Sequence, residues 1–164
     1  MPGTPEVIER AEQPYVAIRT TVTMESIGAA SGHFPVLFEW LASHGNGPAG
    51  PPFFKYDVID MASQLQIEVG VPVPTRLTDD GSVVTGVLPA GRYASIIHVG
   101  HPGQLADTTA ELLAWAESNG LAFDTTASSE GERWACRLES YLTDPAEQPD
   151  MNKWATQLAF LLVS

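Results

Sequence analysis

The sequence repeats one pattern twice, and this internal repeat constrains the fold more than any other feature. The stretch 34–45 (FPVLFEWLASHG) resembles the stretch 111–120 (ELLAWAESNG), so that Trp40 matches Trp115. Apolar residues recur every three or four positions around both stretches, which predicts two amphipathic helices. Each stretch ends in a glycine, which suits a helix C-terminus that needs a positive φ. A repeat of this kind indicates that the chain uses one structural unit twice.

A strand is expected before each predicted helix. Residues 15–19 (YVAIR) match residues 93–97 (YASII), and in both segments the second and fourth residues are apolar. Because side chains alternate across a strand, these apolar residues should face the helix, whereas Tyr15 and Tyr93 should share the opposite face. Further strand-like segments follow each helix, at 53–59 and 64–71 in the first half and at 133–142 and 156–162 in the second.

Each half therefore has the order strand, helix, strand, strand, with the first half at about 12–75 and the second at about 90–164. The segment between them is rich in Pro and Gly, and its Asp80-Gly81 pair predicts a tight hairpin turn. We expect an α+β fold in which tandem duplicated βαββ units form one antiparallel sheet. Both helices would lie on one side, with a central ligand cleft and pseudo-twofold symmetry. The 164 residues would form a single domain.

The charge balance excludes two classes of partner. Twenty acidic residues against eight Lys and Arg give a formal net charge of −12. Nucleic acids and anionic membrane surfaces both attract clustered cations, which this chain lacks, so we expect neither as a partner. Most of the acids are expected to be solvated, including Glu39, Asp57, Asp60 and Glu68.

Other classes are excluded by what the sequence lacks. Its one cysteine, Cys136, allows neither an intrachain disulfide framework nor a four-thiolate zinc site. No apolar run approaches the ~20 residues of a membrane span, and the polar N-terminal residues contain no secretory signal. We therefore expect a cytoplasmic protein. It would be a monomer or a weak dimer.

No cofactor or metal site is expected. The glycine-rich segment 45–50 lacks the Lys-Ser/Thr pair of a phosphate-binding loop. His98 and His101 form an HxxH pair at the end of a strand. Residues three apart on a strand point to opposite faces, so the two histidines should not bind one metal ion.

Glu139 is the most informative acid because it lies in the middle of a predicted strand, between Leu138 and Leu142. Alternation places Arg137, Glu139 and Tyr141 on one face. The other face, assigned to helix packing, would hold Trp134, Cys136, Leu138 and Leu142. Two interpretations remain open. Glu139 pairs with Arg137 or lies on a solvated face, or it is a counter-ion at the floor of an apolar cleft, available to a ligand cation.

Aromatic residues gather near the predicted strands. Many of them must belong to the core, but those on the face of Glu139 would add π-surface to a carboxylate, which suits delocalised cations. The aromatic residues concerned are Trp40, Phe53, Phe54, Tyr56, Tyr93, Trp134, Tyr141 and Trp154.

Five short motifs, in this order and spacing, resemble the GyrI-like effector-binding family, which also supplies the ligand-binding domain of some multidrug-responsive transcription regulators. The motifs are 52–57 (PFFKYD), 68–73 (EVGVPV), 88–93 (LPAGRY), 98–100 (HVG) and 139–145 (ESYLTDP). The resemblance covers about residues 12–163. Residues 1–13 are too short and too acidic for a DNA-binding segment, so the chain resembles a stand-alone member of the family.

The resemblance implies a cleft between the halves in which a glutamate at the place of Glu139 takes up cationic aromatic compounds. Tyr141, Tyr93 and Tyr56 lie in the matching motifs, which carries ligand contact to them. The ligand-binding set expected from the motifs and the aromatic pattern is Glu139, Tyr141, Tyr93, Tyr56, Phe54, Trp40 and Trp134.

Three functions remain open. The first is a binder of amphipathic, cationic aromatic compounds, for drug sensing or sequestration. The second, implied by stand-alone relatives, is a hydrolase of reactive cyclopropane-type genotoxic compounds, in which Glu139 and Tyr141 would be catalytic. The third is an acidic protein-interaction module that uses the surface acids Glu130, Glu132, Glu147 and Asp150.

Overall fold

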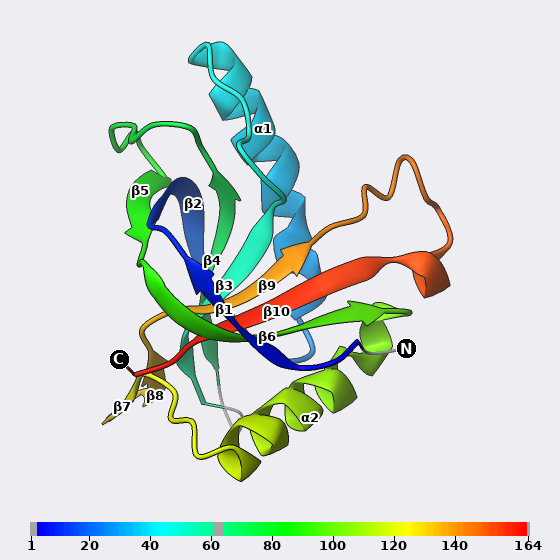
Figure 1. Ribbon diagram of the computed structural model, residues 1–164. Coiled ribbons are helices and arrows are strands. Elements are labelled where there is room, and N and C mark those ends of the chain that lie inside the picture. Colours follow the sequence, from blue (N-terminus) through cyan, green and yellow to red (C-terminus); the bar gives the residue numbers. More distant parts are fainter. Residues whose placement is uncertain (1–2, 61–63, 164) are drawn as a thin grey trace.

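The computed structural model describes residues 3–60 and 64–163. Within these residues, ten strands form one antiparallel sheet that two α-helices accompany (Figure 1). The strands are β1 (Glu6–Arg10), β2 (Gln13–Val22), β3 (Phe53–Ile59), β4 (Leu65–Pro72), β5 (Val83–Leu88), β6 (Gly91–Val99), β7 (Thr125–Ser128), β8 (Gly131–Trp134), β9 (Arg137–Tyr141) and β10 (Ala155–Leu161). The helices are α1 (His33–Ser43) and α2 (Leu105–Ser118), and the short 3₁₀ turns are Ile27–Gly32, Pro102–Gln104 and Met151–Lys153.

The strand order follows the predicted duplication. It is β1-β6-β10-β9-β3-β4-β2-β5, with β8 added on β3 and β7 on β8. The order is symmetric about the β9–β3 pair: β9 corresponds to β3, β10 to β4, β6 to β2 and β1 to β5. Each unit also has an extra leading strand that pairs with the other unit, because β1 pairs with β6 and β5 pairs with β2. The α+β fold with duplicated units is therefore confirmed, and the exchange of leading strands is an addition to it.

Both helices form where the apolar spacing predicts them. Leu37 and Leu41 are the buried residues of α1, and the buried residues of α2 include Leu112 and Ala116. The amide of Gly45 donates to the carbonyl of Ala42 after α1, and the amide of Gly120 donates to Glu117 after α2. These glycines have φ values of 70° and 69°, the left-handed conformation that suits a helix C-terminus.

The sheet has two different faces. On the face that we call the helix face, α1 packs over one apolar cluster, which includes Val16, Ile18, Phe54 and Val69, and α2 packs over another, which includes Ala94, Ile96, Leu158 and Phe160. The opposite face, the back face, holds a third cluster that includes Tyr15, Phe53, Tyr93, Leu138 and Ala159. Tyr15 and Tyr93 thus share the face away from the helices, as the strand pattern predicts. In Figure 1, β9 and β10 run between α1 at the top of the view and α2 at the bottom.

The predicted strand 133–142 is wrong in one respect that matters for the site. It breaks at Ala135–Cys136 into β8 and β9, so the alternation of side chains loses its phase there. Trp134 packs in the cluster under α2, whereas Cys136 and Leu138 lie in the back-face cluster. The side of β9 that carries Arg137, Glu139 and Tyr141 is therefore the helix face, and Leu142 is exposed.

Two further expectations concern the loops and the membrane. Gly81 has a φ of 61°, and the backbone of Asp80 exchanges two hydrogen bonds with Val83, which confirms the tight turn. In the described part of the chain, neither helix combines the length and the apolar character that crossing a bilayer requires.

Candidate functional site

Glu139 is the one acid in an apolar row that crosses the centre of the helix face. Residues paired directly across antiparallel strands share a face, so the ladder fixes the members of this row. Leu158 on β10 and Phe54 on β3 flank Glu139, with Val69 and Ile96 beyond them. The row runs Ile18, Val69, Phe54, Glu139, Leu158, Ile96. Its first three members lie in the cluster under α1 and its last two in the cluster under α2, so Glu139 lies on the seam between the helices.

Two tyrosine hydroxyls donate to the carboxylate of Glu139. The Tyr141 hydroxyl lies 2.5 Å from Oε1, and the Tyr56 hydroxyl lies 3.2 Å from Oε2. Protein surrounds the side chain closely, yet part of its surface remains accessible to solvent. Burial raises the pKa of Glu139 above its usual value, although both tyrosines and Arg137 act in the opposite direction.

Arg137 does not neutralise Glu139 by an ion pair. Among the described residues, no ion pair links Arg137 to an acid. Its guanidinium stacks instead on the rings of Trp134 and Phe160, with 4.5 Å from Cζ to each ring centroid. The buried Nε atom has no hydrogen-bond partner in the described structure, and burial lowers the pKa of the group. The interpretation that Glu139 pairs with Arg137 is therefore wrong, and in the described structure no cation lies within ion-pair distance of the carboxylate.

Aromatic rings line the α1 side of Glu139. The ring of Phe54 stacks on that of Phe34, at a centroid distance of 5.6 Å, and meets the ring of Tyr141 edge-on at 5.3 Å. Together with Tyr56, these rings form an aromatic wall beside the carboxylate. We call Glu139, Tyr56, Tyr141, Phe54 and Phe34 the Glu139 site. Trp134, a further expected ligand residue, lies on the α2 side, where its ring contacts the guanidinium of Arg137.

A second buried acid lies on the back face, where the sequence analysis expected solvated side chains. Glu68 is only 3% exposed, so the expectation of a solvated residue is wrong for it. The Tyr15 hydroxyl donates to Glu68 over 2.7 Å, and Lys55 forms an ion pair with it at 3.2 Å. Lys55 also forms a close ion pair with Asp57. Gly86 makes this geometry possible, because a Cβ there would come within 2.8 Å of the Tyr15 ring.

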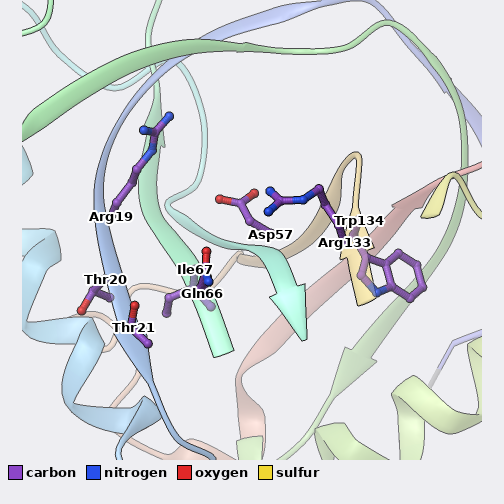
Figure 2. A pocket seen from close by; sticks show the side chains of 8 residues that line it. All are labelled: Arg19, Thr20, Thr21, Asp57, Gln66, Ile67, Arg133 and Trp134. Atoms are coloured by element: carbon purple, nitrogen blue, oxygen red, sulfur yellow. The ribbon is translucent and has the colours of Figure 1, made fainter. Parts of the chain in front are cut away.

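This Glu68 cluster, made of Tyr15, Lys55, Asp57 and Glu68, is internally compensated. Burial opposes the charged form of Glu68, but its bonds to Asp57, Lys55 and Tyr15 together lower its pKa. The pKa of Asp57 moves in the opposite direction, because burial and its hydrogen bond with Glu68 raise it to about 7. Burial alone would lower the pKa of Lys55, yet the two acids raise it. Asp57 also borders an open pocket, in which it lies between Arg19 and Arg133 (Figure 2).

One signal in the sequence could have revealed this cluster. Lys55 and Asp57 alternate along β3 with Phe54 and Tyr56, so a strand with aromatic residues on one face must carry the two charges on the other. A lysine and an acid on one face of a central strand need partners when that face is covered.

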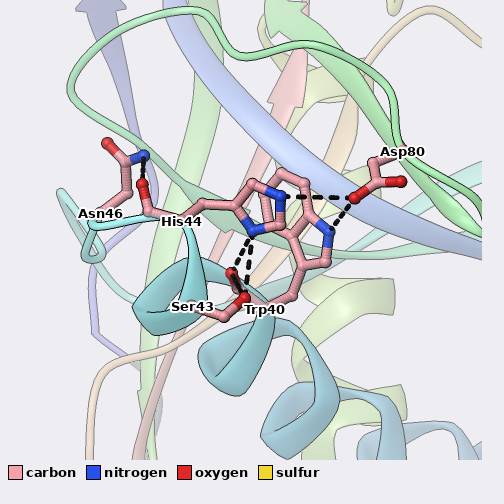
Figure 3. Close-up of polar contacts among 5 residues, drawn as sticks. All are labelled: Trp40, Ser43, His44, Asn46 and Asp80. Atoms are coloured by element: carbon pink, nitrogen blue, oxygen red, sulfur yellow. Dashed lines mark hydrogen bonds and ion pairs between the residues drawn. The ribbon is translucent and has the colours of Figure 1, made fainter.

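The structure does not bring the remaining two expected ligand residues to Glu139. Tyr93 lies on the back face, 1% exposed, and its hydroxyl donates to the carbonyl of Pro89 over 2.6 Å. Trp40 lies near the end of α1, where its ring stacks on His44 at 4.1 Å (Figure 3). Its indole N–H donates to Asp80, which also lies 3.3 Å from Nε2 of His44. Both residues therefore hold the fold together at other places.

The histidines serve local structure. His98 is buried, with Nδ1 2.7 Å from the Thr108 hydroxyl, and Nδ1 of His101 accepts from the amide of Gly103. Across residues 3–60 and 64–163, no group of three or more His, Cys, Asp or Glu side chains is arranged to hold a metal ion.

Comparison with known proteins identifies a family and a fold. The model of the GyrI-like small molecule binding domain matches residues 3–159. A comparison with curated proteins finds no match. Among solved structures, the C-terminal domain of EcmrR has a TM-score of 0.73 at 17% identity, with 98% of both chains covered. This chain spans 57% of the EcmrR chain in its complex with DNA.

Two further structures share the fold at low sequence identity. A hydrolase from Listeria innocua has a TM-score of 0.67 at 17% identity, with 98% of this chain and 92% of that chain covered. The protein SAV2435, bound to tetraphenylphosphonium, has a TM-score of 0.58 at 12% identity, with 99% of this chain and 95% of that chain covered.

Proposed function

Because the chain belongs to the GyrI-like small molecule binding family, we propose that the Glu139 site binds amphipathic aromatic compounds that carry a delocalised positive charge. The role would be to sense or sequester such compounds. One observation carries this proposal: Glu139 is a partly buried carboxylate without an ion-pair partner in the described structure, on the seam between the two helices.

The carboxylate of Glu139 and the aromatic wall beside it favour a cation whose charge is delocalised. A desolvated carboxylate attracts positive charge strongly, and the rings of Phe54 and Tyr141 offer π-faces and apolar area to the rest of the ligand. Arg137 would oppose a compact ammonium ion nearby. Its stacking on Trp134 and Phe160 holds the guanidinium on the α2 side, and a cation whose charge is spread over several rings suffers less from this repulsion. SAV2435, which shares the fold, is described as bound to a cation of this class.

The test is a titration with tetraphenylphosphonium, followed by calorimetry. We expect Glu139→Gln to lose about 2–5 kcal/mol of binding free energy, because a desolvated charge pair disappears. Glu39→Gln on the exposed side of α1 removes the same charge and should bind as the wild type does. The neutral analogue triphenylphosphine oxide should distinguish little between Glu139→Gln and wild type. Equal affinity of the wild type and Glu139→Gln for the cation would overturn the proposal.

A second candidate function is hydrolysis at the same site. The observation in its favour is the short bond from the Tyr141 hydroxyl to Glu139, a carboxylate whose pKa burial raises. A carboxylate with a raised pKa is a better general base for a water molecule, and the pKa of Tyr141 is raised too, so the phenol keeps its proton and can polarise a leaving group. A hydrolase from Listeria innocua shares the fold.

Mass spectrometry would separate the two functions. A cyclopropane-bearing alkylating compound, incubated in excess over the protein, should gain one water per molecule with the wild type. Tyr141→Phe and Glu139→Gln should each abolish turnover. Recovery of unchanged compound only, even with stoichiometric wild type, would count against hydrolysis of this class and leave the binding role unaffected.

A further inference from the structure

A pocket of about 710 Å³ has its charged residues on the back face, although Trp134, which stacks on Arg137, also lines it. Arg19, Asp57, Gln66 and Arg133 lie along it, and Figure 2 shows Asp57 between the two arginines. The ladder explains the arrangement. Arg19 pairs with Glu68, which pairs with Lys55, and this charged row of the back face leads into the pocket wall.

The next row along the same face supplies polar groups. Thr21 pairs with Gln66, Gln66 pairs with Val58, and Val58 pairs with Arg133 on β8. Three of these four side chains line the pocket and can donate hydrogen bonds. The pocket is thus built from two successive rows that four neighbouring strands contribute, β2, β4, β3 and β8.

Local backbone geometry directs Asp57 into this place. The register of β3 against β4 shifts between Tyr56 and Val58, so that Asp57 is the additional residue of a β-bulge. A bulge bends a strand and re-aims a side chain, and bulges are common next to functional sites. Here the bulge brings the carboxyl group to the pocket while Lys55 binds it from the interior.

The charges of the pocket are opposite in sign to those of the chain. Within the described residues, neither Arg19 nor Arg133 forms an ion pair or a side-chain hydrogen bond, although the chain has 20 acids and only 8 Lys and Arg. The acid of the pocket, Asp57, shares the cation Lys55 with Glu68. Two acids remain close to the pocket: Asp79, which accepts from Thr85 and interacts electrostatically with Arg19, and Glu130, which accepts from Gln66.

We propose that this pocket is a second ligand site, in which Arg19 and Arg133 bind a small organic anion through its carboxylate or phosphate groups. The planar guanidinium forks match two-oxygen acceptors, and the hydroxyl of Thr21 can add a further donor. Asp57 would accept from a hydroxyl or amine of the same ligand. The proposal does not depend on the function of the Glu139 site, since Arg19, Arg133, Thr21 and Asp57 are not part of that site.

Titration with citrate and, separately, with inorganic phosphate tests the site, with backbone amide shifts followed by NMR. We expect saturable binding below about 10 mM, with the largest shifts on β2, β3 and β8. Arg19→Gln and Arg133→Gln should each weaken binding about tenfold or more. Arg92→Gln, which removes an exposed charge on β6 outside the pocket, should leave the affinity within about twofold of wild type.

The comparison of the two anions identifies the ligand class. Tighter binding of citrate assigns a carboxylate ligand, and tighter binding of phosphate assigns a phosphate ligand. Glu139→Gln should bind either anion as the wild type does, so a failure at one site does not affect the conclusion about the other. Absence of saturable binding, or equal affinity in wild type, Arg19→Gln and Arg133→Gln, would overturn the proposal.

Discussion

Two glutamates of the sheet, Glu68 and Glu139, have similar hydrogen-bond partners but opposite shifts in pKa. Glu68 on the back face and Glu139 on the helix face each accept a hydrogen bond from a tyrosine, at 2.7 and 2.5 Å. Only Glu68 has a lysine within ion-pair distance. Accordingly, the pKa of Glu68 is lowered and that of Glu139 is raised. The difference favours Glu139 over Glu68 as the proposed ligand site, because only Glu139 lacks a cation at ion-pair distance.

The largest expected effect comes from removing the counter-charge. Lys55→Met should lower the free energy of unfolding by about 3–5 kcal/mol, because it leaves buried acids without their cation. Arg137→Met is the matched change on the helix face. It should cost less than about 1.5 kcal/mol, since it removes ring contacts but no ion pair. Urea unfolding of both variants measures the contrast, and equal losses would remove the distinction between the two acids.

Hydroxyl deletion gives a smaller effect. Tyr15→Phe removes a bond to a buried, charged acid and should cost about 1.5–3 kcal/mol. Tyr56→Phe removes a longer bond of 3.2 Å from an acid that keeps Tyr141 and some access to solvent, so about 0.5–1 kcal/mol is expected. Thermal and urea unfolding should agree on this order. A larger loss in Tyr56→Phe would show that Glu139 depends on its tyrosines as strongly as Glu68 does.

The pH dependence of the folding stability is a further difference between the two faces of the sheet. Asp57 has a pKa of about 7 in the folded protein, so the folded state binds a proton that the unfolded state releases near its ordinary value of 3.8. The stability from this proton is fully present below pH 3.8 and is lost as the pH rises through 7. Between pH 6 and 8, the wild type should lose about 1 kcal/mol relative to Asp57→Asn. A constant difference between the two proteins across this range would contradict the assignment of the proton to Asp57.

The smallest predicted change in the free energy of unfolding is a gain in stability. Glu139→Gln should raise the free energy of unfolding by about 0.5–1 kcal/mol at pH 8, because burial raises the pKa of Glu139 and makes its charged form costly. The gain should disappear near pH 4, since the raised pKa means that the folded wild type is already protonated there. For a chain of this length, about 1 kcal/mol corresponds to about 2–4 °C in Tm. A lower Tm of Glu139→Gln at pH 8 would mean that Glu139 stabilises the fold.

Most of the fold could be predicted from the internal repeat in the sequence. Matching Trp40 with Trp115 and the two tyrosine-led strands was sufficient to place both helices, their glycine ends and the common face of Tyr15 and Tyr93. The leading strands β1 and β5 were not predicted, because each pairs with a strand of the other unit. The local sequence therefore contains no pattern that indicates them. Short edge strands of this kind depend on partners that are distant in sequence.

The candidate site was predicted in part, for a reason that concerns strand phase. Glu139, Tyr141, Tyr56 and Phe54 lie together as expected, but on the helix face, because the break at Ala135–Cys136 resets the alternation. A continuous pattern cannot reveal such a break. The compensation of Glu68 by Lys55 was equally hidden, since it depends on the registry of β3 against β4.

The exchange of leading strands has a mechanical consequence. β1 leads into the first half along the chain but pairs with β6 of the second half, and β5 leads into the second half but pairs with β2 of the first. Each half is therefore bordered at its outer edge by the leading strand of the other half. Pulling the halves apart at the β3–β9 seam would therefore load these two outer ladders as well. The part of the sheet around Glu139 is therefore expected to keep a fixed width. If Glu139 binds ligands as proposed, adaptation to molecules of different size would depend on the helices and side chains above the sheet. Substitutions on the inward sides of α1 and α2 should then alter ligand preference without altering the spacing of the strands.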